Sequence, residues 1–566
     1  MTSAHGVAIF LACYRENVFA KVQAPDDPYM ISRRVTLAAA LGTAAVGWTL
    51  DVWPATPELD HSRPAGPVRT VAVREYGAAG DGRADDTAAF QAAHDNLPDG
   101  GVIVVDDGLY DLRTVAVTHR YVTIRLAPGA VLRRIGPIDL ASRGMFMIEL
   151  VGAHFKLEGG TIDLNGEGPM GIGIPGRLPN RYGVQTVADV CAIAGPANAA
   201  VYAVRSSFVV VSGVTIRNSG ETALLWRNCG HVLVEACRFA NIANFGIEYS
   251  LVTADHDGGS GPMPVRGECT VAHCAFEDID DYGLGTGNGI GVGGGGGGDL
   301  GTFGGFKIAD CTFARCQRDI HFEFLSGSRI ERLAIVRIRS RDARQGSFGL
   351  IGVRDVTIDD YIAIDPGSAP TSALVGHYPS IYGGILSGDF DRVRLKNLQI
   401  LDRRDHGVRS GRQAAVVAGG RECVARDATF AAGDVGAFLG IRGANPNGAW
   451  YVGRIAEVLA HDRVKLDLPA GATVRAAAYA YGGATREGLV LTHGGRVAMQ
   501  NVQIAAGRGS GLPGEPPAAG LRVEALAAPL QASASTIMLS PGDTGGAVGI
   551  RSGTGLAPPG IAVRGS

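Results

Sequence analysis

Two short segments of the sequence alternate acidic or polar residues with apolar ones. In FGIEYS the polar members are Glu248 and Ser250, and in RDIHFEF they are His321 and Glu323. Neighbouring residues of a β-strand point to opposite faces, so each polar pair should share the outer face of its strand. Two carboxyl groups on one face suit glycosidic bond cleavage, in which one acid protonates the leaving oxygen and one carboxylate activates water or attacks the sugar carbon.

The catalytic candidates are Glu248, Asp281, His321 and Glu323. When GI of the first segment is aligned with DI of the second, Glu248 and His321 fall in one column, and Ser250 and Glu323 in the next. The segment YGLGTGN between them is almost bare of side chains and would leave a floor for a sugar. Strands are spaced ~4.8 Å apart, so candidates two strands apart lie roughly 10 Å apart, near the ~6.5–9.5 Å of inverting glycosidases. Phe322 and Phe324 behind Glu323 would partly desolvate it, which suits the acid, with Glu248 or Asp281 as its partner.

Candidate substrate contacts lie beside these residues. They are Arg227, Trp226, Tyr249 and Arg318, with Trp226 expected to stack on a sugar face. No cofactor is predicted for a hydrolase. A lyase would use Ca²⁺, for which Asp255 and Asp257 are candidate oxygen ligands, although a flexible acidic loop is the favoured interpretation of these two residues.

An internal repeat predicts the elements that position these residues. Cys237, Cys274 and Cys311 recur at intervals of 37 residues, and residues 209–226 align without a gap on residues 232–249 at a shift of 23. Short β-rich repeats of this length are typical of the coils of a parallel β-solenoid. We expect Val214 and the three cysteines to form an inward column without disulfides. The extra residues of the longer repeats should leave as loops, 251–264 and 287–305, that wall a cleft.

The segment VREYGAAGDGRADDTAAFQAAHDNLPDGGVIVVDDGLYDL resembles the start of the pectate-lyase-like superfamily through its YGA, GDG, DDT, GGVIVV and GLY phrases. This resemblance implies an all-β fold, a right-handed single-stranded parallel β-helix. It also implies an N-terminal capping helix over Thr87 to Asn96, capped by Asp85 or Asp86. In this superfamily the usual activity is carbohydrate cleavage on the outer face of the middle coils. The motifs of polygalacturonases (Asn-Thr-Asp, Asp-Asp, Gly-His-Gly, Arg-Ile-Lys) do not occur here in order. DIDDYG supplies a double aspartate, but no Gly-His-Gly follows it and no Arg-Ile-Lys exists, so the reaction stays open.

The chain divides into six regions. Residues 1–29 are interpreted as a start-site artefact upstream of Met30, and 30–50 as an export signal in which Arg33 and Arg34 indicate the twin-arginine route. A linker follows at 51–68, then a β-helix at 69–430. A small β-barrel-like insert at 431–485 is similar to inserts of tailspike-like proteins, and 486–566 holds the last coils and a loose tail. This layout predicts a periplasmic or secreted protein.

The amino-acid composition narrows the classes of molecule that the chain is expected to bind. The net charge of −3 gives no basic excess for nucleic acid, and the sequence has no apolar run of the length that a membrane span needs. Three functions fit: a polysaccharide hydrolase with two carboxylates, a lyase or epimerase acting on a uronate-containing glycan, and a carbohydrate-binding solenoid without activity. The partner expected in each case is a polysaccharide, bound by a monomer or, by analogy with tailspike-like proteins, a homotrimer.

Overall fold

The structure is a computed structural model of the 566-residue chain. It describes residues 67–135, 148–151, 154–165, 199–220, 222–251, 268–279, 287–294, 302–323, 329–368, 382–404, 407–444, 451–508, 518–539, 548–552 and 561–564. The predicted start-site segment, the export signal and most of the linker lie outside these ranges. Within them, no helix is long and apolar enough to cross a membrane.

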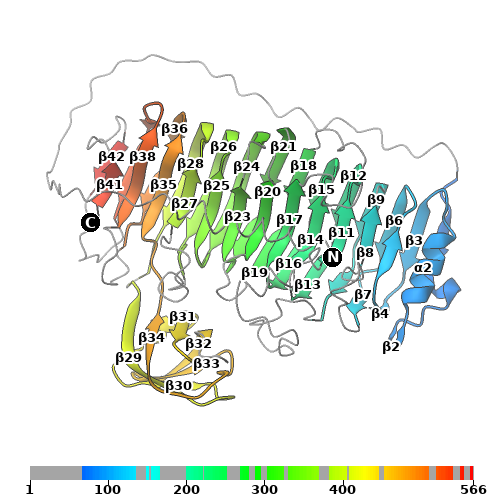
Figure 1. Cartoon of the computed structure of the whole chain (residues 1–566), viewed down its shortest axis with the longest axis horizontal. Helices are drawn as coiled ribbons and strands as arrows, with labels where there is room; N and C mark the ends of the chain where they lie inside the picture. Colours follow the sequence, from blue (N-terminus) through cyan, green and yellow to red (C-terminus); the bar gives the residue numbers. More distant parts are fainter. Residues whose placement is uncertain are drawn as a thin grey trace, which may run out of the picture.

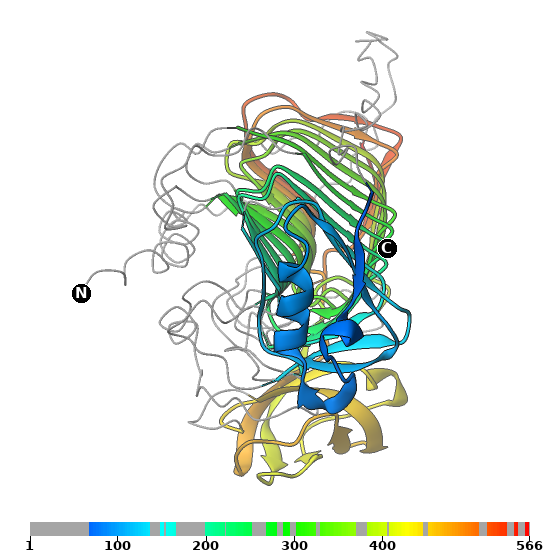
Figure 2. The same ribbon diagram turned by 90° about the vertical axis from the view of Figure 1, so that its right-hand side faces the viewer.

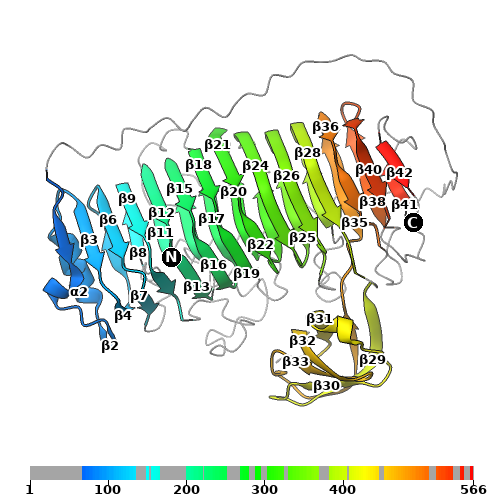
Figure 3. The ribbon, with the colours of Figure 1, turned by 180° about the vertical axis from the view of Figure 1, so that it is seen from behind.

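The described strands stack in parallel along one axis (Figures 1 and 3). One series, here called sheet B, contributes one strand per coil: β5 (Val115–Val117), β8 (Ile148–Val151), β11 (Ala199–Val204), β14 (Thr222–Arg227), β17 (Phe245–Leu251), β20 (Asn288–Gly294), β23 (Arg318–Glu323), β25 (Gly346–Ile351), β27 (Tyr382–Ser387), β35 (Glu487–Gly494), β38 (Ala519–Leu526) and β41 (Val548–Ser552).

The remaining strands of the stack form sheet A, which bends at a corner within most coils. They are β1 (Thr70–Ala72), β2 (Asp81–Asp85), β3 (Gly101–Val105), β4 (Gly108–Leu112), β6 (Val122–Leu126), β7 (Ala130–Arg134), β9 (His154–Glu158), β10 (Thr161–Asp163), β12 (Phe208–Ser212), β13 (Thr215–Ser219), β15 (His231–Glu235), β16 (Arg238–Ile242), β18 (Glu268–Ala272), β19 (Ala275–Ile279), β21 (Thr302–Ala309), β22 (Thr312–Ala314), β24 (Arg329–Arg341), β26 (Arg354–Ile364), β28 (Asp391–Leu401), β36 (Val497–Gln500), β37 (Gln503–Ala505), β39 (Gln531–Ser533), β40 (Ser535–Met538) and β42 (Ile561–Arg564). The predicted parallel β-helix is thereby confirmed.

Strand pairing reproduces the repeat read from the sequence. Val209 pairs with Val232, a shift of 23 residues, and Val232 pairs with Cys269, a shift of 37. Because side chains alternate with a period of two, a correct shift also places each residue on the correct face. The repeat therefore fixed the register of this part of the stack.

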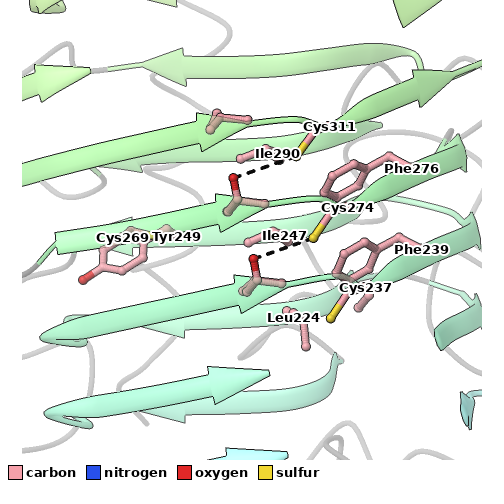
Figure 4. Packing of buried hydrophobic residues seen from close by; sticks show 14 of the residues in the cluster. Leu224, Cys237, Phe239, Ile247, Tyr249, Cys269, Cys274, Phe276, Ile290 and Cys311 are labelled. Carbon is pink, nitrogen blue, oxygen red and sulfur yellow. Dashed lines mark hydrogen bonds between the residues drawn. The ribbon is translucent and has the colours of Figure 1, made fainter. Parts of the chain in front are cut away.

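The predicted cysteine column is inward and buried. Cys237, Cys274 and Cys311 are at most 2% exposed, and each thiol donates a hydrogen bond to a backbone carbonyl. Figure 4 shows them in line, with aromatic rings stacked beside them. The seven cysteines of the described residues are all free and buried. Stacked coils thus pack thiols as small apolar groups.

An aromatic ladder runs beside the cysteines. The ring of Phe276 stacks on those of Phe239 and Phe313 with 4.7 Å between centroids in both cases. Equivalent positions of successive coils lie one strand spacing apart, which is also the distance at which aromatic rings stack well. The core is therefore built from columns of like side chains.

The helix α2 (Thr87–Asp95) lies at the N-terminal end of the stack (Figure 2). It follows the short 3₁₀ helix η1 (Val73–Tyr76) and buries Phe90 edge-on against Tyr110. Asp85 accepts the first helical N–H, that of Thr87, at 3.1 Å. Asp86 instead accepts the N–H groups of Ala79 and Gly80 and braces the preceding loop.

A closed antiparallel barrel interrupts the stack between β28 and β35 (Figure 1). Its strands are β29 (Arg409–Val416), β30 (Glu422–Ala425), β31 (Phe438–Ile441), β32 (Tyr451–Ala460), β33 (Arg463–Leu466) and β34 (Val474–Tyr481), with the 3₁₀ turn η3 (Ala432–Asp434). The sequence prediction started this insert at residue 431, which is wrong, because β29 and β30 close the barrel. Short strands before 431 resemble coil strands, and only their antiparallel pairing reveals the barrel.

The barrel is tied to the β-helix at two places. At its neck, the buried carboxylate of Asp402 accepts hydrogen bonds from Arg404 at 2.9 Å and from the Thr485 N–H at 3.1 Å. Further along, Arg454 of the barrel donates to Asp278 at 2.7 Å. The guanidinium carbon of the buried Arg344 lies 3.5 Å from the centroid of the Phe438 ring. These contacts hold the barrel beside the coils of β20, β23 and β25.

Candidate active site on the outer face of sheet B

The outer face of sheet B brings the predicted polar pairs into register. Glu248 pairs with Gly291, and Gly291 pairs with His321; Ser250 pairs with Gly293. Gly293 in turn pairs with Glu323. The column assignment made from the sequence is thus the register found in the structure. The intervening strand, however, is NGIGVGG rather than the expected YGLGTGN, so part of the predicted loop 287–305 forms β20 and the start of β21.

Glu323 and His321 form a pair on β23. The Nε2 atom of His321 lies 3.2 Å from Oε2 of Glu323, and their side chains are 10% and 15% exposed. Burial, and then the charge of Arg318, lower the pKa of His321, while the hydrogen bond with Glu323 acts in the opposite direction. A neutral imidazole donates its Nε2–H to the carboxylate and leaves Nδ1 as an acceptor. Among the described residues, Oε1 of Glu323 has no hydrogen-bond partner, and a hydrogen bond with the Gly349 backbone also raises the pKa of His321.

Glu248, two strands away, has a different environment. Burial raises its pKa above the usual value, although the charge of Arg227 and a hydrogen bond from Ser250 act in the opposite direction. The Ser250 hydroxyl donates to Oε1 of Glu248 at 2.9 Å. The two carboxyl groups therefore differ: burial raises the pKa of Glu248 above its usual value, and Glu323 accepts a hydrogen bond from a histidine.

The two predicted arginine contacts differ in position. Arg227 is half-buried on β14 and pairs with Ser250 across the strands. Its guanidinium carbon lies 5.8 Å from the centroid of the Tyr202 ring. Arg318 is only 3% exposed and donates its Nε–H to Oε1 of Gln345 at 2.9 Å. It acts on His321 through its charge rather than through an exposed surface.

The prediction of Trp226 and Tyr249 as substrate contacts is wrong. Both side chains are 0% exposed and belong to the hydrophobic core. They pair with each other across β14 and β17 on the inner face, and the Tyr249 hydroxyl donates to the backbone oxygen of Cys229. Strand alternation sends them inward together with Ile247. Asp281, Asp255, Asp257 and the predicted wall loops, except for their strand-forming ends, lie outside the described residues.

Two aromatic residues of this face escaped the sequence analysis. An added Cβ at Gly291 would lie 2.4 Å from the Phe245 ring, and one at Gly349 would lie 3.3 Å from the Tyr382 hydroxyl and 2.9 Å from Nδ1 of His321. Gly349 pairs with His321 on the side opposite Gly291. The sequence signal for both is an aromatic residue at the start of one strand and a glycine in a neighbouring strand of sheet B.

Within the described residues, no group of three or more His, Cys, Asp or Glu side chains is arranged to hold a metal ion.

The similar solved structures named here are distant from this chain in sequence. No family model and no curated protein matches the sequence. Among solved structures, the adhesin PfbA of Streptococcus pneumoniae is similar at 12% identity with a TM-score of 0.42, covering 88% of this chain and 100% of that one. The family 28 exopolygalacturonase of Yersinia enterocolitica is similar at 13% identity with a TM-score of 0.39, covering 87% and 80%.

A third similar structure is the polygalacturonase of Erwinia carotovora, at 12% identity with a TM-score of 0.36, covering 86% of this chain and 98% of that one. At such identities the likeness concerns the fold alone. The architecture of this chain, a parallel β-helix interrupted by a barrel, is established by its own strand pairing.

Proposed function

We propose that the chain is a carbohydrate-active enzyme that hydrolyses glycosidic bonds of a polysaccharide on the outer face of sheet B. The observation that carries this proposal is the register Glu248–Gly291–His321, with Glu323 two residues beyond His321. It sets one carboxyl group on each side of a strand without outward side chains at Gly291 and Gly293. Structural neighbours include both polygalacturonases and an adhesin, so the site and not the fold supports this function.

Glu248 is the proposed general acid and Glu323 the proposed base. A glycosidic oxygen leaves with the proton of Glu248 as the bond to the anomeric carbon breaks. Water attacks the same carbon from the opposite face and gives its proton to Glu323. This assignment reverses the roles expected from the sequence, because burial favours the protonated form of Glu248 and His321 donates to Glu323.

The geometry favours inversion of the anomeric centre. Two strand spacings separate the carboxylate-bearing strands, about 10 Å, whereas the carboxyl groups of retaining enzymes lie only ~5–5.5 Å apart. The proposal is tested by incubating the protein with polygalacturonate, alginate, hyaluronan and xylan. New reducing ends and the configuration of the fresh product, read by proton NMR, report the reaction. Retention of configuration would contradict the water-mediated mechanism.

A lyase is the second candidate, favoured by the group beside His321. Its Nδ1 atom and the Tyr382 hydroxyl both lie within 3.3 Å of the position of a Cβ on Gly349. Histidine and tyrosine are suitable bases for removing the proton next to a uronic carboxylate. Elimination creates a double bond that absorbs in the ultraviolet, and hydrolysis does not. New ultraviolet absorbance during incubation with an acidic glycan would therefore identify the protein as a lyase and contradict the proposed hydrolase activity.

Binding without any cleavage in these assays would support the third candidate, a carbohydrate-binding solenoid. The site residues would then be contacts for the glycan rather than catalysts.

A further inference from the structure

Phe245 is a large aromatic side chain at the start of β17 that does not enter the core. It is half-buried and is absent from the described hydrophobic clusters, unlike Ile247 two residues later. The adjoining Gly246 faces the core, since an added Cβ there would lie 2.9 Å from the Phe276 ring. Gly246 and Ile247 both face inward, so alternation breaks between them and Phe245 is directed to the outer face.

The Phe245 ring lies over Gly291. A Cβ on Gly291 would approach the ring to 2.4 Å, so only glycine leaves room for the ring in this position. Gly291 itself faces outward, because Ile290 and Val292 on either side of it are buried in the core. The ring therefore covers the bare strand that separates Glu248 from His321.

We propose that Phe245 is the sugar-stacking platform of the site, in place of the buried Trp226 and Tyr249. This inference rests on the proposed function, which places the site on the outer face of sheet B. It adds which part of the ligand Phe245 recognises: a pyranose ring that presents a face of C–H groups. Such a face packs on an aromatic ring by dispersion and by removal of apolar surface from water. A pyranose on this ring would lie between the two carboxyl groups.

Glycan binding tests the platform independently of catalysis. An array of pyranose oligosaccharides from the four polysaccharides named above is probed with the unmodified protein and with F245A, F245W and G291A. We expect F245A to weaken binding at least tenfold, which corresponds to about 1.4 kcal/mol, and F245W to retain it. G291A should resemble F245A, because its methyl group displaces the ring. In the double variant F245A/G291A the second change should add nothing.

Phe208 provides a matched control, since it is a half-buried phenylalanine at the start of a strand of sheet A. F208A should bind as the unmodified protein does. Unfolding is excluded by an unchanged Tm of F245A. Equal binding by F245A and the unmodified protein, or no binding by any form, would overturn the platform. If F245A loses glycan binding and the unmodified protein cleaves none of the glycans, the stacking role of Phe245 is supported and the proposed hydrolase activity is contradicted.

Discussion

Asp319 on β23 faces Ser340 on β24 in the interior of the β-helix. At the equivalent position of the preceding coil, Gly289 on β20 faces Phe313 on β22. Gly289 leaves room for the Phe313 ring, which a Cβ would approach to 2.8 Å, and Phe313 pairs in register with Ser340. The Ser340 hydroxyl donates to Asp319, and the Tyr361 hydroxyl lies 3.4 Å from the same carboxyl oxygen. An acid–serine pair thus stands where the preceding coil has a glycine–phenylalanine pair.

This pair predicts strong coupling in a double-mutant cycle. D319G should leave a cavity and hydroxyls without their acceptor, and S340F should collide with Asp319, so each should lower the free energy of unfolding by about 2–4 kcal/mol. D319G/S340F recreates the preceding coil and should recover most of that loss. Chemical denaturation of the four forms measures the coupling. If the changes in unfolding free energy of the two single variants simply add in the double variant, residues 319 and 340 are not in contact in the core.

Replacing either carboxyl group by an amide should stop catalysis without unfolding the chain. E323Q and E248Q should each lower kcat by at least about a hundredfold, since each removes a proton-transfer group. Their Tm values should stay close to that of the unmodified protein. E235Q is the matched control, because Glu235 ends a strand of sheet A on another face. Full activity of both E323Q and E248Q would show that neither carboxyl group takes part in catalysis.

The pH profile should follow Glu248. A general acid works while protonated, so kcat should fall as pH rises through its pKa, which burial raises. S250A removes a hydrogen bond to the carboxylate and R227Q removes a nearby positive charge, and both changes raise the pKa further. The alkaline limb of kcat should therefore move to higher pH in both variants. Movement to lower pH would exclude Glu248 as the acid.

His94 should make the N-terminal end sensitive to acid. The buried ring accepts the N–H groups of Thr118 and His119 on Nε2 at 3.3 and 3.4 Å, and its Nδ1 lies 2.9 Å from Asp95. Burial, together with the charge of His119, lowers the pKa of His94, although Asp95 raises it.

The unfolded chain takes up the His94 proton as pH falls through about 6.5, while the folded chain does so only at lower pH. The stability contributed by His94 is therefore present above that pH and lost below it. Tm should fall more between pH 7.5 and 5.5 in the unmodified protein than in H94Q, and H461Q, at an exposed turn, should behave as the unmodified protein. Parallel Tm curves for H94Q and the unmodified protein would contradict this role.

Export is proposed from the sequence of residues 30–50. Twin arginines are read as a pair by their receptor, so R33K/R34K should reduce the exported fraction. A chain beginning at Met30 should be exported as well as the full chain. Cell fractionation and blotting measure both. Undiminished export of the double lysine variant would contradict the proposed route.

The sequence determined the coil stack and much of the site. Shifts of 23 and 37 residues set which strands pair, and a period of two then decided that Cys274 lies inward and that Glu248 and His321 share one outer column. Both follow from the backbone, because parallel strands repeat their hydrogen-bonding geometry residue by residue.

Tertiary structure alone decided the exceptions to this period. The alternation of side chains along β17 breaks at Gly246, so Phe245 points outward while Tyr249 stays in the core. The pattern of apolar residues in the sequence does not distinguish these two aromatic rings. The barrel begins at Arg409 because its strands pair antiparallel, a choice made by distant partners and not by local composition. The state of Glu248 likewise depends on burial by other coils, since desolvation is a property of the space around a carboxyl group and not of its neighbours in the chain.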